Sequence, residues 1–162
     1  MTMDNATFTV RSLAYDHPAA EALRAAMQEE MSRRYADRLA ADPGHLPAGM
    51  AVRAESVLFT GIAFDAERPV GHVLLRRLGD EVELKRMYVA PSHRGGGVAR
   101  SLLAAAEEAA GALGARRVIL QTGDRQPDAI RLYEREGYTR IPIFPPYTSM
   151  THSTCFEKRI VG

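Results

Sequence analysis

A run of three consecutive glycines, Gly95 to Gly97, constrains the fold of this chain more than any other feature. The residues before it, 82–89, alternate like a β-strand, and the residues after it follow the apolar spacing of a long helix. Glycines at such a junction let the backbone approach a ligand closely, because no side chain intervenes. The first free N–H groups of the helix, with Arg94 beside them, favour a phosphate or pyrophosphate. The sequence therefore predicts an anion-binding loop between a strand and a helix.

Three kinds of glycine-rich phosphate loop compete at this position. Loops that hydrolyse nucleoside triphosphates close with Lys followed by Ser or Thr, where this chain has Val98 and Ala99. Dinucleotide loops need Gly-x-Gly-x-x-Gly, and here position 100 is arginine. The remaining pattern is Arg94-x-x-Gly97-x-Ala99 after Tyr-Val-Ala-Pro. It resembles the acyl-coenzyme-A pyrophosphate loop of the GNAT N-acetyltransferase superfamily.

The regions on either side of the loop strengthen this resemblance. The strand at 83–89 and the segment 129–138 also match the superfamily, in the right order, so that the resemblance covers residues 80–140. It implies acetyl-CoA as the cofactor. The residues that it implies for cofactor binding are Met87, Tyr88, Val89, Arg94, Gly95, Gly96, Gly97, Val98, Ala99, Gln126 and Tyr133. Gln126 departs from the asparagine that the family often has there, which alters the coenzyme contacts.

The composition excludes several classes of protein. The 162 residues form one expected domain, 1–162, with 46% apolar and 25% charged residues, as in ordinary globular proteins. The net charge of +1 gives no reason to expect nucleic acid or an acidic membrane surface as a partner. We expect no membrane span, no signal peptide and, because the five histidines are scattered, no metal. The single cysteine, Cys155, fits a reducing cytoplasm. Assembly into a homodimer is left open.

The apolar patterning predicts alternating strands and helices. Strands are expected at 7–14, 57–64, 69–78, 82–89, 117–122 and 154–160, with extended chain at 141–146. Helices are expected from 18, over 95–113 and from 127 to a cap at 137. A loop is expected at 41–49. Short turns join the strands from 57 to 89, so these strands should form an antiparallel meander. The fold class is mixed α/β (α+β). The order coincides with the GNAT arrangement, a central, mostly antiparallel mixed sheet flanked by helices.

The fourth strand shows a change of phase. Its apolar positions are even at Val82 and Leu84 and odd at Met87 and Val89. Since the faces of a strand alternate strictly, the change needs one extra residue near 85–86, that is, a β-bulge. The resemblance implies that this strand is also splayed and that the gap accepts the pantetheine arm of coenzyme A. The alternative is a strand buried on both faces, whose phase carries no meaning.

The function expected from the resemblance is transfer of acetyl from acetyl-CoA to a primary amine of a small molecule, by direct attack in a ternary complex. Amino acids, polyamines and antibiotic-like amines are candidate acceptors. The amine must first lose a proton, because an alkyl ammonium has a pKa of about 10 and is no nucleophile. Two alternatives stay open: a peptide or protein acceptor, and an acyl-CoA-binding domain without catalysis.

Glu83 is the candidate base. It lies six residues before the end of its strand, where many GNAT enzymes place a glutamate that deprotonates the acceptor. A partly desolvated carboxylate there would accept a proton more readily. Glu81, two residues away, is the candidate for binding a cationic acceptor or for replacing Glu83. The alternative for Glu83 is a solvent-facing side chain paired with Lys85 or Arg86.

Two further groups complete the predicted chemistry. A backbone N–H in the bulge, from Tyr88 or Met87, would stabilise the oxyanion. Tyr133 is the candidate acid for the leaving thiolate, because the motif Leu-Tyr-x-x-x-Gly-Tyr matches the superfamily and a phenol has a pKa near 10. The alternative for Tyr133 is a tyrosine packed in the core.

The acceptor pocket is expected beside the proline-rich connection 142–153, which borders it in this superfamily. Tyr147 and His152 are the candidate substrate-binding residues there. The same connection could instead be surface covering. A small acceptor is favoured because residues 15–55 have the pattern of a short covering helix and loop.

Overall fold

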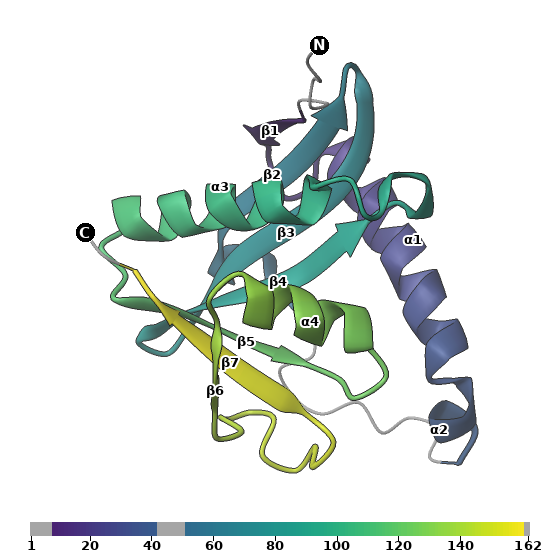
Figure 1. Cartoon of the computed structure of the whole chain (residues 1–162), viewed down its shortest axis with the longest axis vertical. Helices are drawn as coiled ribbons and strands as arrows, with labels where there is room; N and C mark the ends of the chain where they lie inside the picture. The colour runs from purple at the N-terminus through teal and green to yellow at the C-terminus, as the bar shows by residue number, and fades with distance from the viewer. Residues whose placement is uncertain (1–7, 42–50, 161–162) are drawn as a thin grey trace.

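The computed structural model describes residues 8–41 and 51–160, and these residues include one sheet of seven strands in the order β1-β2-β3-β4-β5-β7-β6 (Figure 1). All neighbours are antiparallel except β4 and β5, which are parallel. The mixed, mostly antiparallel sheet and its β2–β3–β4 meander are confirmed. The strands are β1 (Thr9–Ser12), β2 (Val57–Asp65), β3 (Arg68–Leu78), β4 (Glu81–Val89), β5 (Arg117–Thr122), β6 (Thr139–Ile141) and β7 (Thr154–Arg159).

The helices follow the predicted order, with one short addition. They are α1 (Pro18–Arg34), α2 (Ala36–Ala41), α3 (Val98–Ala112) and α4 (Pro127–Arg135), with single 3-10 turns at Ala54–Ser56 and Pro91–His93. The sequence does not predict α2, and it places the start of α3 three residues too early. The extended stretch expected at 141–146 is wrong beyond Ile141: β6 begins two residues earlier and ends there, because the prolines beyond it lack a donor for the ladder. Nearly all of the predicted loop at 41–49 falls outside the described residues.

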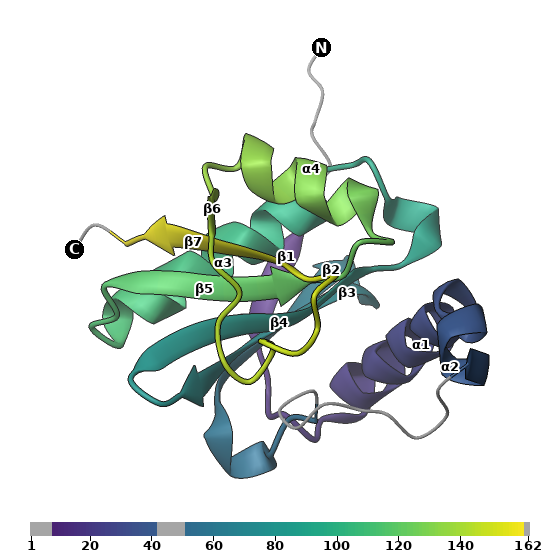
Figure 2. The ribbon, with the colours of Figure 1, turned by 90° about the horizontal axis from the view of Figure 1, so that it is seen from below.

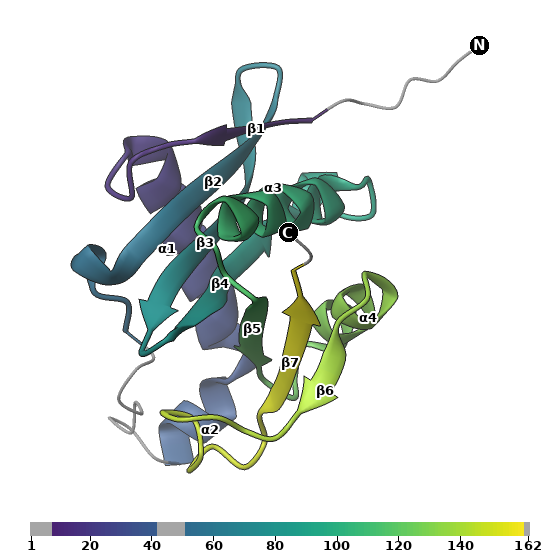
Figure 3. The ribbon, with the colours of Figure 1, turned by 90° about the vertical axis from the view of Figure 1, so that its left-hand side faces the viewer.

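The two faces of the sheet are covered by different helices. On one face, α3 packs Leu102 and Ala106 against a cluster that includes Val82 and Leu84 of β4. On the other face, α1 packs Ala20 and Leu23 against residues of β2 and β4, and Figure 3 shows α1 and α3 on opposite sides of these strands. The side chains of β4 at 83 and 85 therefore face α1. Among the described residues, no helix is both long and apolar enough to cross a membrane.

The pairing of β3 with β4 changes register near the end of β4. His72 lies opposite Tyr88, whereas Leu74 lies opposite Lys85. Two residues of β4, one of them Arg86, therefore face a single residue of β3. Arg86 has a φ of +58°, a left-handed conformation that is uncommon for a residue other than glycine. The change of register lies where the sequence predicts one extra residue.

The parallel contact between β4 and β5 is short. Val82, Glu83 and Leu84 pair with Val118, Ile119 and Leu120 of β5. These pairs join the meander to the β5–β7–β6 part of the sheet. The predicted splaying of β4 beyond them stays a prediction.

Candidate active site

The glycine loop between β4 and α3 has the backbone that an anion site needs. Gly95 and Gly97 have φ of +82° and +93°, values that side chains rarely adopt. Gly97 is the N-cap of α3, and among residues 8–41 and 51–160 no side-chain hydrogen bond caps this helix. A Cβ at either glycine would meet no atom within 4 Å, so the backbone conformation and not crowding requires glycine here. The loop borders open space with free donors.

Arg94, the predicted cation of this loop, is held from two sides. Its Nε donates to the carbonyl oxygen of Val89 at 2.9 Å, and its Nη2 lies 2.7 Å from Oε1 of Glu30 on α1. Glu30 also pairs with Arg34 at 2.9 Å. A pyrophosphate at the loop must therefore share Arg94 with Glu30 or displace this carboxylate.

Helix α2, which follows α1 after one residue, contacts the loop between β5 and α4. Arg38 forms a bidentate pair with Asp124 at 2.8 and 2.7 Å, and Asp37 forms a second pair with Arg125. Gln126, predicted to bind the cofactor, follows directly and precedes the first residue of α4. Helices α1 and α2 thus contact both the glycine loop and the β5–α4 loop, and Figure 2 shows them along one side of the molecule.

A buried polar cluster lies on the α1 face of the sheet, centred on Glu83. Glu83 is 0% exposed. Its Oε1 accepts from Arg76 Nε at 2.7 Å, and its Oε2 accepts from the hydroxyl of Tyr147 at 2.7 Å. Lys85 donates to the same hydroxyl at 2.7 Å. The predicted solvent-facing alternative for Glu83 is therefore wrong, since the 142–153 connection lies over this face and contributes Tyr147.

Lys85 is a functional candidate that sequence reasoning missed. Its Nζ lies 4.0 Å from Oε2 of Glu83. The pKa of Lys85 is lowered from 10.5 to about 8, mainly by burial; Glu83 opposes the change, and Arg86 and Arg76 add to it. The signal in the sequence was the strand period, which places Lys85 on the same face as Glu83.

His72 connects α1 to β4 at the change of register. Its Nε2 lies 2.9 Å from Nη1 of Arg24, and its Nδ1 lies 2.9 Å from the carbonyl oxygen of Arg86. A guanidinium only donates and a carbonyl only accepts, so these partners assign a neutral imidazole with its proton on Nδ1. Burial lowers the pKa of His72 to about 4, which agrees with this assignment.

Comparison with known proteins identifies this arrangement. Residues 19–138 match the Acetyltransferase (GNAT) family. The chain belongs to the GNAT acetyltransferase family. An IAA acetyltransferase of Azospirillum brasilense is 32% identical over 136 residues, which are 80% of this chain and 86% of the relative.

Solved structures share the GNAT fold of this acetyltransferase. One from Klebsiella pneumoniae is 29% identical, with a TM-score of 0.76, over 97% of this chain and 100% of that chain. A GNAT family acetyltransferase from Elizabethkingia anophelis, with acetyl-CoA bound, is 15% identical, with a TM-score of 0.67, over 97% of this chain and 99% of that chain. The second likeness shows the fold alone.

In this GNAT acetyltransferase the predicted acid, Tyr133, is packed among aromatic rings. It lies on α4, with ring centroids 5.6 Å from Tyr138 and 6.0 Å from Phe156. Burial raises the pKa of the Tyr133 hydroxyl, which keeps it protonated at neutral pH. A protonated phenol is the form that an acid needs, and the packing equally fits the core alternative.

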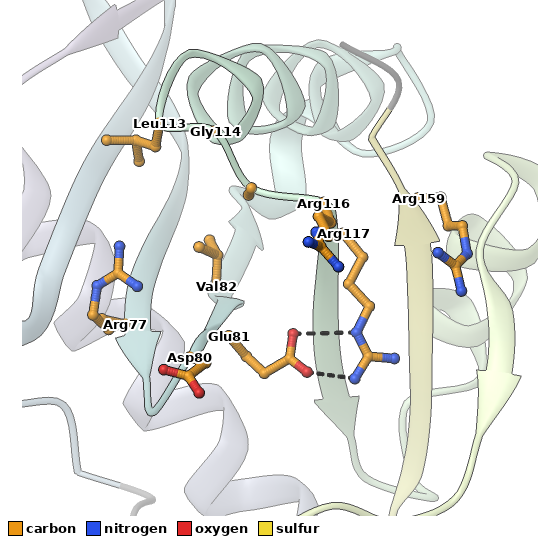
Figure 4. A pocket seen from close by; sticks show the side chains of 10 residues that line it. Arg77, Asp80, Glu81, Val82, Leu113, Gly114, Arg116, Arg117 and Arg159 are labelled. Carbon is orange, nitrogen blue, oxygen red and sulfur yellow. Dashed lines mark hydrogen bonds and ion pairs between the residues drawn. The ribbon is translucent and has the colours of Figure 1, made fainter.

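Glu81 is placed apart from the Glu83 cluster. Arg117 donates to both of its oxygens, at 3.1 and 2.5 Å, and this hydrogen bonding lowers the pKa of Glu81 (Figure 4). The pair lines a pocket of about 490 Å³ at the first residue of β4, whereas the glycine loop follows its last residue. The carboxylate that the sequence offers for a cationic acceptor is thus already bonded to an arginine.

His152 and Tyr147, predicted together, are separated by the structure. Tyr147 is fully buried in the Glu83 cluster, whereas His152 is exposed. The pKa of Asp124 is lowered mainly by its hydrogen bond from Arg38, and His152 is near enough to add a smaller effect. Within the described ranges, no three His, Cys, Asp or Glu residues are grouped as metal ligands.

Proposed function

We propose that this GNAT acetyltransferase moves acetyl from acetyl-CoA to a primary amine of a small molecule by direct attack in a ternary complex. The observation that carries the proposal is the placement of two sites on one strand. The glycine loop follows β4 and leads into α3, which covers one face of the sheet; the same strand presents Glu83 and Lys85 to the other face, where α1 packs. A donor and an acceptor can therefore meet at β4 from different directions.

The donor site uses the glycine loop and the end of β4. The N–H groups at the start of α3 and the Arg94 guanidinium hold the pyrophosphate. Backbone groups of β4 pair with the amides of the pantetheine arm. Residues of the loop, the strand and α4 complete this site: Met87, Tyr88, Val89, Gly95, Gly96, Gly97, Val98, Ala99, Gln126 and Tyr133.

Starting from the ammonium, the nitrogen loses two protons, one before the attack and one after the C–N bond forms. The thiolate takes up one, so each turnover releases one proton. The amine nitrogen bonds to the thioester carbon, and the C–S bond breaks as the tetrahedral intermediate collapses. A backbone N–H of Tyr88 or Met87 stabilises the oxyanion. Tyr133 gives its proton to the departing thiolate.

Glu83 accepts the amine's proton through Tyr147. Both carboxylate oxygens of Glu83 already accept hydrogen bonds, one of them from the Tyr147 hydroxyl. The Tyr147 oxygen itself accepts from Lys85 Nζ at 2.7 Å and from Arg76 Nη2 at 3.1 Å. As the hydroxyl passes its proton to Glu83, its oxygen takes a proton from the amine, which replaces one of these two donors. Burial, with Glu83 alongside, raises the pKa of Tyr147, so the phenol relays a proton without staying ionised.

A small acceptor fits the covering of this face. Helix α1 packs on it, and Tyr147 anchors the 142–153 connection in the buried cluster. A peptide would require an open groove there. The lone, buried Cys155 supports a reducing cytoplasm as the location, and a homodimer stays a prediction.

The test is thiol release from acetyl-CoA with a panel of amino acids, polyamines, aminoglycosides and peptides. We expect acetyl-CoA-dependent acetylation of at least one class of small amine. Acetyl-CoA binding without turnover on any amine would instead support the acyl-CoA-binding domain. Equal thermal stabilisation by NADH would contradict the donor site.

A further inference from the structure

The α1 face of β3 and β4 gathers four basic side chains: Arg24, Arg76, Lys85 and Arg86. Arg86 lies near enough to both Arg24 and Lys85 for their charges to affect each other's ionisation, and Glu83 opposes the effect on Lys85. Besides burial, Arg86 and Arg76 lower the pKa of Lys85, and besides burial, Arg76 and Arg24 lower the pKa of Arg86. Buried like charges of this kind are costly unless anions offset them.

Two of these cations have no hydrogen bond to a carboxylate within residues 8–41 and 51–160. Arg24 bonds to the neutral His72 and to the carbonyl oxygen of Tyr15, at 2.9 and 2.5 Å. Lys85 donates to the phenol of Tyr147, and the Glu83 oxygen lies 4.0 Å away. Within these ranges no carboxylate offsets the charge of Arg24, and Lys85 shares its one carboxylate, Glu83, with Arg76.

A small pocket lies beside this cluster. Its volume is about 180 Å³, and Tyr15 and Thr60 are among its lining residues. The guanidinium carbon of Arg24 lies 3.8 Å from the ring centroid of Tyr15, so the pocket and the cluster share this tyrosine. Thr60 is 2% exposed, and in the described part of the chain its hydroxyl lacks a hydrogen-bond partner. A buried hydroxyl of this kind suits a polar ligand group.

Thr60 and Lys85 lie in one row across the sheet. Thr60 pairs with Leu74 on β3, and Leu74 pairs with Lys85 on β4. The row and Arg24 thus lie on the same face as the Glu83–Tyr147 relay, and the pocket reaches this row at Thr60. We infer that the acceptor amine carries a carboxylate as well, and that Arg24 and Lys85 bind this carboxylate beside the Tyr15–Thr60 pocket. The inference rests on the proposed function and names the acceptor class as amino-acid-like.

The anionic groups of the donor do not account for this cluster. The pyrophosphate belongs to the glycine loop, which leads into α3, and α3 covers the opposite face of the sheet from α1. The acceptor's carboxylate is thus the anion that offsets Arg24 and Lys85, through charge-assisted hydrogen bonds.

The same surroundings assist the amine itself. An alkyl ammonium already present on this face, that of Lys85, has its pKa lowered from 10.5 to about 8. Burial and neighbouring arginines act in the same way on the ammonium of an acceptor bound there. More of the bound acceptor is then a free amine at neutral pH, so a smaller fraction of it must be deprotonated through Tyr147.

The test compares three forms of one compound: an amino acid, its methyl ester and the amine that remains after decarboxylation. We expect kcat/KM to be about 10-fold or more higher for the amino acid, chiefly through KM, because hydrogen bonds to charged groups are strong. Arg24→Gln should remove most of this preference. Arg77→Gln is the matched control, since Arg77 is exposed and lines the separate pocket at the start of β4.

The outcomes separate the carboxylate site from the proposed acetyl transfer. Turnover of amines with equal kcat/KM for the three forms overturns the inference and leaves the proposed function standing. If no amine is acetylated, the proposed function fails. Calorimetry on the CoA-bound protein then compares an N-acetyl amino acid with its methyl ester, and equal affinities overturn the inference as well. Lys85→Met repeats the test should Arg24→Gln not fold, and the wild-type comparison needs no variant.

Discussion

Glu30 of helix α1 lies 2.7 Å from the Nη2 of Arg94, so the arginine that begins the glycine loop is bonded to a helix on the other side of β4. This pair competes with the pyrophosphate for one guanidinium. Glu30→Gln removes the competing charge and should tighten acetyl-CoA binding by a few-fold, as measured by calorimetry. Glu29→Gln is the control, because Glu29 is next to Glu30 in the sequence and pairs with the exposed Arg33. Weaker binding by Glu30→Gln would show that the carboxylate positions Arg94.

The glycine loop gives a second prediction. Gly97→Ala forces a side chain onto a φ of +93° and disturbs the first N–H groups of α3, so acetyl-CoA should no longer raise the melting temperature appreciably. Gly79→Ala separates strain from binding, since Gly79 has a φ of +61° in the turn before β4 and a Cβ there meets nothing within 4 Å. Both variants should lose similar stability, by about 1–2 kcal/mol. If acetyl-CoA raised the melting temperature of both variants equally, the glycine loop would not be part of the donor site.

The relay gives a third prediction, on turnover. Glu83→Gln and Tyr147→Phe should each lower kcat by about 10²-fold or more while acetyl-CoA affinity changes little. Tyr133→Phe should do the same if it protonates the thiolate. Single-turnover acetyl transfer measures the chemical step directly. Full activity of Tyr147→Phe with loss in Glu83→Gln would mean that Glu83 is reached by another route.

The pH dependence of KM tests Lys85. Its pKa of about 8 means that its charge is lost at mildly alkaline pH. As pH rises through this value, Lys85 loses the charge that binds the acceptor's carboxylate, so KM for an amino acid should rise on this limb while kcat changes little. Lys85→Met should abolish this limb in KM and leave the ionisation of the free amine in kcat/KM. An unchanged KM profile in the variant would remove Lys85 from acceptor binding.

The pH dependence of stability tests His72. Its pKa is about 4 in the folded protein and about 6.5 when unfolded, so between these values the unfolded chain binds a proton that the folded chain does not. Stability is therefore complete above pH 6.5 and is lost as pH falls towards 4, by up to about 3 kcal/mol from this group. Urea unfolding at several pH values should show this loss in wild type and a smaller one in His72→Gln. The exposed His152→Gln variant should behave as wild type.

The sequence predicts the parts of this molecule that depend on neighbouring residues. The bounds of β5, the meander and the change of register near Arg86 follow from local periodicity and turn signals. The glycine loop follows from residue type, because Gly95 and Gly97 adopt backbone angles that other residues avoid.

The buried cluster could not be predicted, since its contacts join distant segments. Arg76 meets Glu83 only through the register of β3 on β4, which no single segment specifies. Tyr147 reaches them from a connection without periodicity, 64 residues further along the chain than Glu83. His72 has the pattern of an ordinary strand residue, and its role depends on Arg24 of α1.

The short parallel contact between β4 and β5 also divides the sheet into two groups of strands. Four strands lie on one side of it and three on the other, and each group is held by its own antiparallel ladders. The chain passes between the groups through α3 and a turn at Gly114, whose φ of +81° borders open space. The protein is thus assembled from two self-paired units whose sheets join through three residue pairs and whose side chains share one apolar core. A break in the polypeptide at Gly114 would leave each unit's ladders whole, and the two fragments could reassemble through those pairs and the shared core.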